Sequence, residues 1–115
     1  MVLELAPAQA IQQLVDELGL SPADIARALN IDTRTLARWR SGATYPQHDG
    51  RARLVELLAL NHRLRASFQT MEAARGWLGD PSHYLGGLSP RDALRAGRID
   101  RISAALEALD SGVFL

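Results

Sequence analysis

Apolar residues recur in the first third of the chain at the three- and four-residue spacings of amphipathic helices. The first such stripe consists of Ile11, Leu14, Val15 and Leu18. Gly19 follows it as a helix stop, and the segment from Ser21 to Asp24 combines a capping hydroxyl, a proline and an acid. A short second helix is therefore expected after Ser21. Asp32 is expected to cap a third helix, which ends at Gly42.

The rest of the chain shows the same kinds of helix start and stop signals. A longer helix is predicted to begin near Arg51, with Leu54, Leu57, Leu58, Leu64 and Phe68 on its buried side. Thr70 and Ser89 are expected to cap two further helices, separated by an irregular stretch over residues 80–90. A last helix is marked by the stripe Ile99, Ile102, Leu106 and Leu109. We therefore predict an all-α fold, a compact bundle of about seven helices.

Two segments of the chain resemble one another. LSPADIARALNID (20–32) and LSPRDALRAGRID (88–100) match at eight of thirteen positions. Their flanking sequences do not match, and Gly97 stands where a helix-turn-helix needs an apolar residue. A duplication is one explanation. We interpret the likeness instead as shared capping chemistry and chance.

Composition bounds the class of protein. The chain has 115 residues, 47% of them hydrophobic, which suits one globular domain or two small helical halves. It has no cysteine, and its net charge of zero argues against a bulk nucleic-acid binder or a membrane-surface protein. No apolar run approaches the roughly 18 residues of a membrane span, and the first residues lack the pattern of a signal peptide. We expect a cytoplasmic protein without a membrane partner.

Positive charge is concentrated in one segment of this neutral chain. The segment over residues 34–53 contains a single acid, Asp49, and five arginines, Arg34, Arg38, Arg40, Arg51 and Arg53. Such a patch favours nucleic-acid binding. The alternative is a solvated helix face without a partner.

The third predicted helix lies within a recognisable pattern. Residues 19–46 read G-L-S-x-x-D-I-A-x-x-L-N-I-D-x-x-T-L-x-R-W-x-x-G-x-x-x-P and resemble the helix-turn-helix domains of the Xre family. With Leu36 and Trp39 pointing inward, Arg34 and Arg38 fall on the opposite face of the helix. Recognition helices contact base edges from such a face. The expected DNA-binding residues are Thr33, Arg34, Thr35, Arg38, Arg40, Arg51 and Arg53.

The C-terminal half also carries a family pattern, formed by Ala74, Trp77, Leu78, Pro81, Leu85, Gly86, Gly87, Pro90, Asp92, Leu94, Gly97, Asp100, Ala105, Leu106, Leu109, Ser111, Gly112, Val113 and Phe114. In this pattern, residues 66–115 resemble the toxin-binding domain of the MbcA/ParS/Xre antitoxins. The resemblance implies a helix-turn-helix domain over residues 1–65 and a toxin-binding domain over residues 66–115. It also implies a partner, a RES-domain toxin that consumes NAD or transfers ADP-ribose from it.

The toxin-binding residues that we expect are Leu85, Gly86, Gly87, Gly112, Val113, Phe114 and Leu115. Adjacent glycines allow backbone conformations closed to other residues. An apolar tail is expected to be buried either in a partner or in the protein's own core. The residues alone do not decide between burial of the tail in a partner and burial in the protein's own core. The family resemblance favours the partner.

An enzymatic function is not expected from this set of residues. His48, His62 and His83 are scattered along the chain, and no cysteine or helical histidine pair offers a metal site. We expect no cofactor, no bound metal and no catalytic residues. Two functions remain: an antitoxin that also represses its own operon, or a plain repressor whose C-terminal half only dimerises.

A homodimer is expected in either case, because one helix-turn-helix covers half of an operator. Its candidate surface is the stripe Ile99, Ile102, Leu106 and Leu109. The competing use of this stripe is the domain's own core.

Overall fold

The computed structural model describes residues 6–112, and over this range the chain is helical without strands. The elements in chain order are α1 (Pro7–Leu18), α2 (Pro22–Leu29), α3 (Thr33–Ser41), α4 (His48–Ser67), α5 (Met71–Gly79), the 3₁₀-helix η1 (His83–Leu85), α6 (Pro90–Arg95) and α7 (Ile99–Ser111). The predicted all-α class with about seven helices is confirmed. None of the helices in this range is long and apolar enough to cross a membrane.

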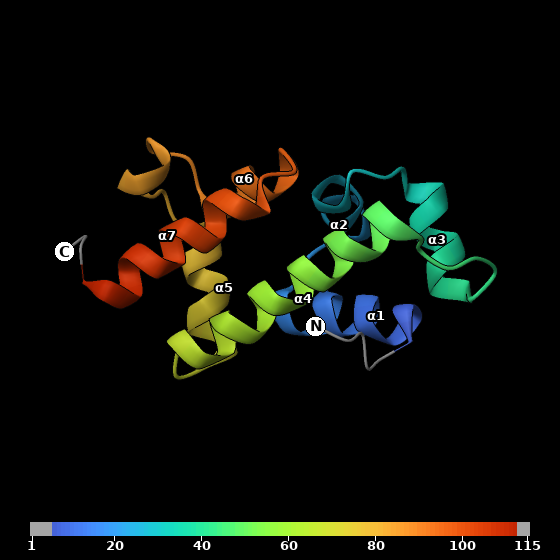
Figure 1. Ribbon diagram of the computed structural model, residues 1–115. Helices are drawn as coiled ribbons and strands as arrows, with labels where there is room; N and C mark the ends of the chain where they lie inside the picture. The colour runs from blue at the N-terminus through green and yellow to red at the C-terminus, as the bar shows by residue number, and fades with distance from the viewer. Residues whose placement is uncertain (1–5, 113–115) are drawn as a thin grey trace.

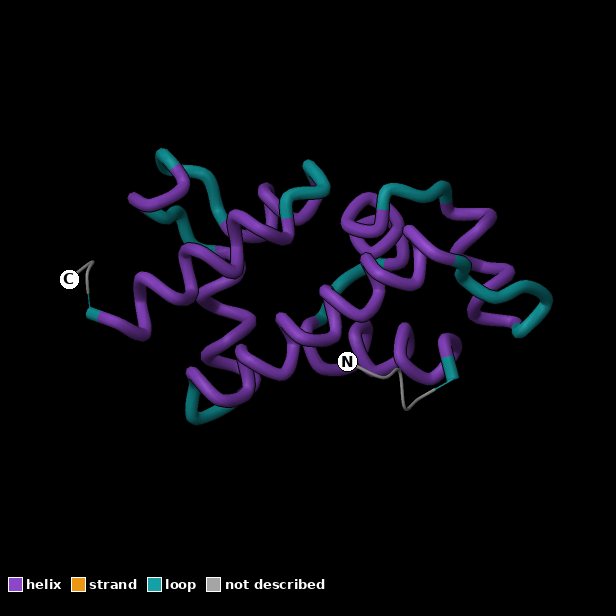
Figure 2. The backbone as a smooth tube through the Cα atoms, in the orientation of Figure 1, coloured by secondary structure: helices purple, strands orange, loops and turns teal. Residues whose placement is uncertain are grey.

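The long helix α4 connects the two halves of the molecule (Figure 1). At one end it packs against α1 and α2, and at the other against α5 and α7. Figure 2 shows the same division in the backbone trace, with α1–α3 on one side and α5–α7 on the other. The molecule is elongated, with extents of 46 × 24 × 23 Å. The two predicted functional halves therefore share one helix.

Side-chain caps start α2, α3, α5 and α6 at the positions that the sequence predicts. Ser21 accepts a hydrogen bond from the backbone N–H of Asp24 at 3.1 Å, and Thr70 accepts one from Ala73 at 3.1 Å. At α6 the exchange is reciprocal, because Asp92 also accepts from the backbone N–H of Ser89 at 3.2 Å. Each such cap contributes on the order of 1 kcal/mol to helix stability. The capping chemistry shared by residues 20–32 and 88–100 is thus confirmed.

One hydrophobic core runs through both halves of the chain. The buried face of α4 supplies Leu54, Leu57, Leu60 and Leu64. The N-terminal half adds Ile11, Leu14, Ile25, Leu29, Leu36 and Trp39, and the C-terminal half adds Leu78, Leu94, Ile102 and Leu106. Complete burial of a side chain of this size contributes roughly 1.5–3 kcal/mol. The division into residues 1–65 and residues 66–115 is therefore a proposal about function, because the two parts share this core.

One sequence-based expectation needs correction, and one alternative left open by the sequence is decided. The long helix begins at His48, earlier than the predicted start near Arg51. For the stripe on α7, use in the domain's own core is confirmed for three of its four residues, because Ile99, Ile102 and Leu106 are at most 3% exposed. Only Leu109, which is 40% exposed, remains available to a partner.

Candidate DNA-binding and partner-binding surfaces

The outer face of α3 presents two arginines to solvent. Leu36 is 1% exposed and Trp39 is 6% exposed, so these two side chains anchor the helix to the core. Arg34 and Arg38 lie on the opposite, exposed face, and Thr33 begins the helix beside them. Within residues 6–112 neither guanidinium is held by an ion pair. Both are therefore free to donate paired hydrogen bonds to a base edge or a phosphate.

The start of α3 is fixed by the carboxylate of Asp32. Its Oδ1 accepts a hydrogen bond from the backbone N–H of Thr35 at 2.7 Å. Hydrogen bonds from Thr35, together with the charge of Arg34, hold the pKa of Asp32 below its usual range. The half-buried Thr35 thus supports the cap through its backbone. A rigid first turn is what a recognition helix needs at its point of entry into the groove.

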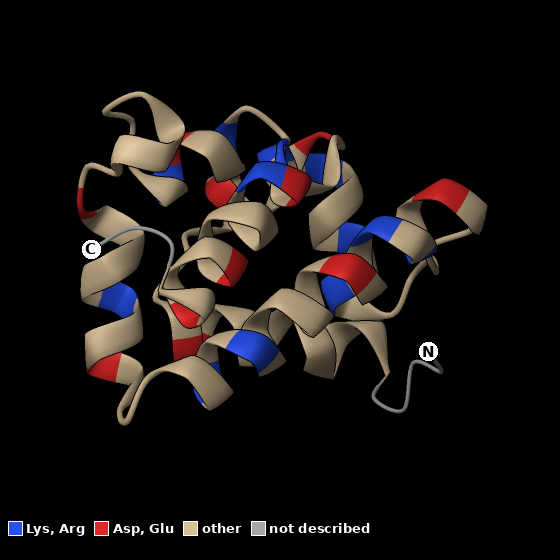
Figure 3. Cartoon of the chain, turned by 60° about the vertical axis from the view of Figure 1, so that its left-hand side comes forward, with Lys and Arg blue, Asp and Glu red and all other residues tan. Residues whose placement is uncertain are grey.

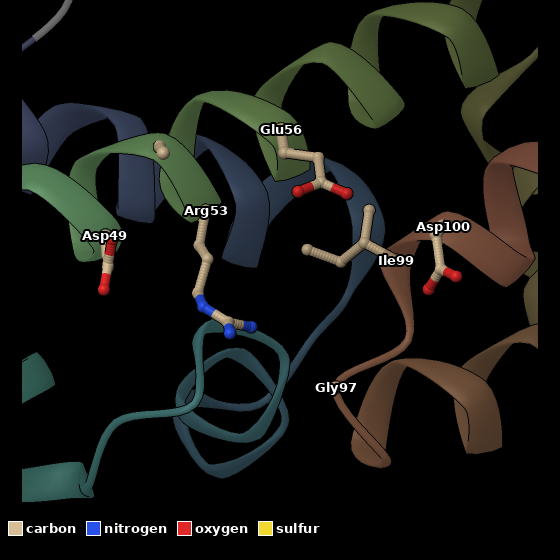
Figure 4. A pocket seen from close by; sticks show the side chains of 7 residues that line it. Asp49, Arg53, Glu56, Gly97, Ile99 and Asp100 are labelled. Carbon is tan, nitrogen blue, oxygen red and sulfur yellow. The ribbon is translucent and has the colours of Figure 1, made fainter.

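The other predicted DNA contacts are not gathered on this face. Arg40 donates from Nη2 to Oε1 of Gln12 in α1 at 2.9 Å, so its guanidinium is engaged by the first helix. Arg51 is exposed on α4, beside Gln47 and His48. Arg53 extends from α4 and lines a pocket between this helix and the segment from Gly97 to Asp100 (Figure 4). The structure therefore groups Thr33, Arg34 and Arg38, and separates the remaining arginines from them.

Tyr45 is an exposed residue that the sequence reasoning missed. It lies in the loop between α3 and α4 and is 67% exposed, whereas the neighbouring Pro46 is buried. The buried proline fixes the loop and leaves the tyrosine ring in solvent. An aromatic residue directly before a loop proline, next to a recognition helix, was the available signal.

The predicted partner loop is closed and supported from within. The backbone N–H of Gly87 donates to the carbonyl of Ser82 at 2.8 Å, and the N–H of Ser82 donates to the carbonyl of Leu88 at 3.0 Å. Gly86 and Gly87 have φ angles of 68° and 91°, the left-handed region that favours glycine. Leu85 is only 6% exposed, so its side chain holds the loop to the core.

Three exposed apolar side chains of the C-terminal half lie outside the predicted set of toxin-binding residues. Leu88 is 57% exposed, Tyr84 is 39% exposed, and Leu109 on α7 is 40% exposed. Tyr84 lies on η1, Leu88 follows it in the loop before α6, and η1 contacts α7. Gly112 ends α7 in the left-handed conformation, and Val113, Phe114 and Leu115 lie outside the described residues. Leu88 could have been noticed as an apolar residue directly before the Ser89 cap.

Charged side chains of both signs are interspersed over the helices rather than separated by half (Figure 3). One ion pair links the halves directly, because Nε of Arg95 in α6 donates to Oδ1 of Asp24 in α2 at 2.8 Å. A second connection joins α1 to α4, where Glu17 accepts from Asn61 at 2.7 Å and pairs with Arg65. No group of His, Asp and Glu within residues 6–112 is arranged to hold a metal ion. The charged groups of Asp24, Arg95, Glu17 and Arg65 therefore connect neighbouring helices.

Comparison with known proteins finds relatives that cover both halves of the chain. Residues 1–49 match the family model of the antitoxin Xre-like helix-turn-helix domain. The mycobacterial cidal antitoxins MbcA of Mycobacterium tuberculosis and Mycobacterium bovis are 29% identical over 108 residues, which cover 94% of this chain and 95% of each relative. In the crystal structure of the M. tuberculosis MbcT-MbcA toxin-antitoxin complex, the matching chain has a TM-score of 0.67 and 28% identity, covering 94% of this chain and 96% of its own length. The chain is therefore similar to the MbcA antitoxins over nearly its whole length, and its first 49 residues match the antitoxin Xre-like helix-turn-helix domain.

Proposed function

We propose that this protein is the antitoxin of a toxin–antitoxin pair, and that its partner is a RES-domain toxin that consumes NAD or transfers ADP-ribose from it. The observation that carries the proposal is the extent of the similarity to MbcA, which covers 94% of the chain. A repressor unrelated to antitoxins would share the helix-turn-helix alone. Here the segment from α5 to α7 is shared as well, and it contains the exposed Leu88, in the loop before α6, and the exposed Leu109, on α7.

In this proposal the two halves have different partners. Residues 66–115 bind and block the toxin, through the surface of Gly86 and Gly87, the exposed leucines and the residues that follow Gly112. Residues 1–65 bind the operator of the protein's own operon through Arg34 and Arg38. The protein acts in the cytoplasm by binding alone, and it reads the operator as a homodimer because one module covers one half-site.

Co-expression with the product of the adjacent gene tests the antitoxin function. A tagged full-length chain is expected to co-purify with that product and to relieve its toxicity in cells. Growth arrest that persists despite a soluble, folded chain would overturn the proposal. Light scattering of the free protein and of the complex tests the dimer, which is contradicted by a single copy of this chain in both.

A plain repressor is the second candidate, because Arg34 and Arg38 are exposed and form no ion pair within residues 6–112, which supports DNA binding whatever the role of α5–α7. The two functions differ in what the neighbouring gene product does. A repressor that is not an antitoxin binds its promoter and leaves the neighbour's toxicity unchanged.

A further inference from the structure

A polar groove lies at the junction of the two halves. It has a volume of about 420 Å³ and is lined by residues from α2, α4 and the end of α6, among them Arg27, Asn30, Arg53, Arg95 and Gly97. Three guanidinium-bearing residues from three different helices thus border one cavity. Asn30, in the left-handed conformation with φ 58°, adds an amide to the same wall.

These three arginines are not neutralised equally. Nε of Arg95 lies 2.8 Å from Oδ1 of Asp24, and Nη1 of Arg95 lies 3.7 Å from Oδ1 of Asp92. Arg27 and Arg53 form no ion pair within residues 6–112. Two positive charges therefore border the groove without a carboxylate partner. Like charges at a common cavity repel each other, and an anion between them removes that repulsion.

The sequence echo shows why Arg27 lacks a partner. Asp24 and Arg27 in α2 occupy the same positions of the echo as Asp92 and Arg95 in α6, and the two helices pack against each other. The ion pair Asp24–Arg95 forms across this contact. Its reciprocal does not, because Asp92 accepts the backbone N–H of Ser89 and lies beside Arg95. Arg27 is left facing the groove without the corresponding acid.

The far end of the groove is acidic, which limits where an anion can bind. Arg53 and Gly97 also line an adjoining pocket of about 450 Å³ together with Asp49, Glu56 and Asp100 (Figure 4). Asp100 is paired with Arg98, whose Nη2 lies 2.8 Å from Oδ2. The unpaired acids Asp49 and Glu56 repel an anion from this pocket. The favourable position is therefore on the side of Arg53 that borders the groove with Arg27, away from Asp49 and Glu56.

We propose that the Arg27–Arg53–Arg95 groove is a binding site for a phosphate group. Planar guanidinium forks match phosphate oxygens, and arginine is favoured where such groups are recognised. The phosphate can come from a DNA backbone, because the groove residues Asn30 and Ile31 lead directly into α3, or from a free nucleotide. In the first case the site extends the proposed operator surface to a residue of the C-terminal half, Arg95.

Titration calorimetry with sodium pyrophosphate at low salt, and anisotropy with a DNA duplex of the protein's own promoter, distinguish the two sources. The variants are Arg27→Gln and Arg53→Gln. The matched control is Arg101→Gln, an exposed arginine on α7 that does not line the groove. Thermal melting of each variant accompanies the titrations. Pyrophosphate should raise the melting temperature of the wild-type protein and of the control. It should raise the melting temperatures of the two groove variants by less.

For a free phosphate ligand, each groove variant should weaken pyrophosphate binding by about tenfold or more, the cost of one lost charge-assisted contact. For a DNA phosphate, the variants should instead weaken duplex binding at all sequences and lower its salt dependence, with Arg34→Ala as a positive control. The proposal is overturned if both affinities change no more than in Arg101→Gln. Toxin neutralisation is scored separately, so failure of this site leaves the antitoxin proposal standing.

Discussion

Arg95 donates a hydrogen bond to Asp24 over 2.8 Å, and the two side chains join α6 of the C-terminal half to α2 of the helix-turn-helix. Asp24 is 8% exposed. Burial by itself raises the pKa of this carboxyl, but the hydrogen bond and charge of Arg95, together with hydrogen bonds at Ser21, lower it below its usual range. A residue of the other half therefore helps to keep the pKa of this buried carboxyl low.

This pair predicts a loss of stability in acid. A carboxyl whose pKa is lower in the folded state stabilises the fold above its unfolded value of about 3.9 and loses that contribution as the pH falls through the folded value. The melting temperature of the wild-type protein should therefore fall below about pH 4. Asp24→Asn should melt lower at neutral pH and show a flatter acid dependence. Thermal melts from neutral to acidic pH check this.

The control for that series is Asp80→Asn, which changes an exposed carboxylate without an ion pair in residues 6–112. Its acid profile should follow the wild type. Asp32, Asp92 and Asp100 also have lowered pKa values, through Thr35, Ser89 and Arg98 respectively, so the variant should flatten the profile without abolishing it. An acid profile of Asp24→Asn that coincides with the wild type would contradict the assignment.

Gly50 in α4 is predicted to be required by its neighbour Trp39. A Cβ at this position would lie 2.8 Å from Cη2 of Trp39, and the ring is only 6% exposed. Gly50→Ala should therefore destabilise the protein by about 1–3 kcal/mol, as overpacking does in a filled core. Gly76→Ala in α5 is the matched control, because nothing lies within 4 Å of its added Cβ. It should stabilise the helix by up to about 1 kcal/mol. Urea unfolding of both variants tests the contrast, which fails if they change stability in the same direction.

The elements that the sequence predicted best are those fixed by local chemistry. Ser21, Asp32, Thr70 and Ser89 each cap the helix that follows within three residues, so no knowledge of the tertiary fold was needed. The helix-turn-helix pattern places Trp39 on the inward face of α3 together with Leu36, and both side chains are buried.

The directions of the individual arginines could not be predicted in the same way. Arg40 is turned toward Gln12, and Arg53 borders a groove that also contains Gly97, a residue far away in the sequence. Both outcomes depend on how α1 and α6 pack against the central helices. The burial of Ile102 has the same origin, because a helix pattern shows which face is apolar but not which neighbour covers it.

DNA binding should depend most on Arg34 and Arg38. Alanine at either position should cost about 1–3 kcal/mol if the side chain pairs with a guanine, and should relax specificity there. Arg40→Ala is the comparison on the same helix, and it should cost less because the guanidinium is bound to Gln12. Arg51→Ala should weaken binding to all sequences and flatten its salt dependence. Anisotropy with the promoter and a scrambled duplex at several salt concentrations measures each term. Absence of salt-sensitive binding by the wild type, with and without the toxin, would contradict a DNA-binding role.

Removal of residues 113–115 should separate inhibition from folding. The deletion begins after Gly112, so every described helix and cap is retained. If these residues enter the toxin, the shortened chain should melt and bind the promoter like the wild type, yet fail to relieve toxicity in cells. Complete neutralisation by the shortened chain would assign the inhibition to the Gly86–Gly87 loop or to the wider surface around it.

The exposed leucines of the C-terminal half should bind the toxin directly. Leu88 and Leu109 are 57% and 40% exposed, so Leu88→Asp and Leu109→Asp should change the free energy of unfolding by only about 0.5 kcal/mol, as surface substitutions usually do. In a buried interface the same change removes apolar contact and leaves an unpaired charge, which weakens binding by about 2 kcal/mol or more. Each variant should therefore restore toxicity while remaining folded.

The control for these leucines is Tyr45→Asp, which places the same charge on an exposed apolar residue of the other half. It should neutralise the toxin as well as the wild type does, because the loop between α3 and α4 lies outside the proposed toxin surface. Calorimetric titration of purified toxin measures the affinities, and growth assays measure neutralisation. Equal loss of neutralisation in all three variants would indicate that charge or stability, and not the surface of α5–α7, decides the outcome. Loss in the leucine variants alone requires contact at that surface, because only there is apolar area removed from the interface.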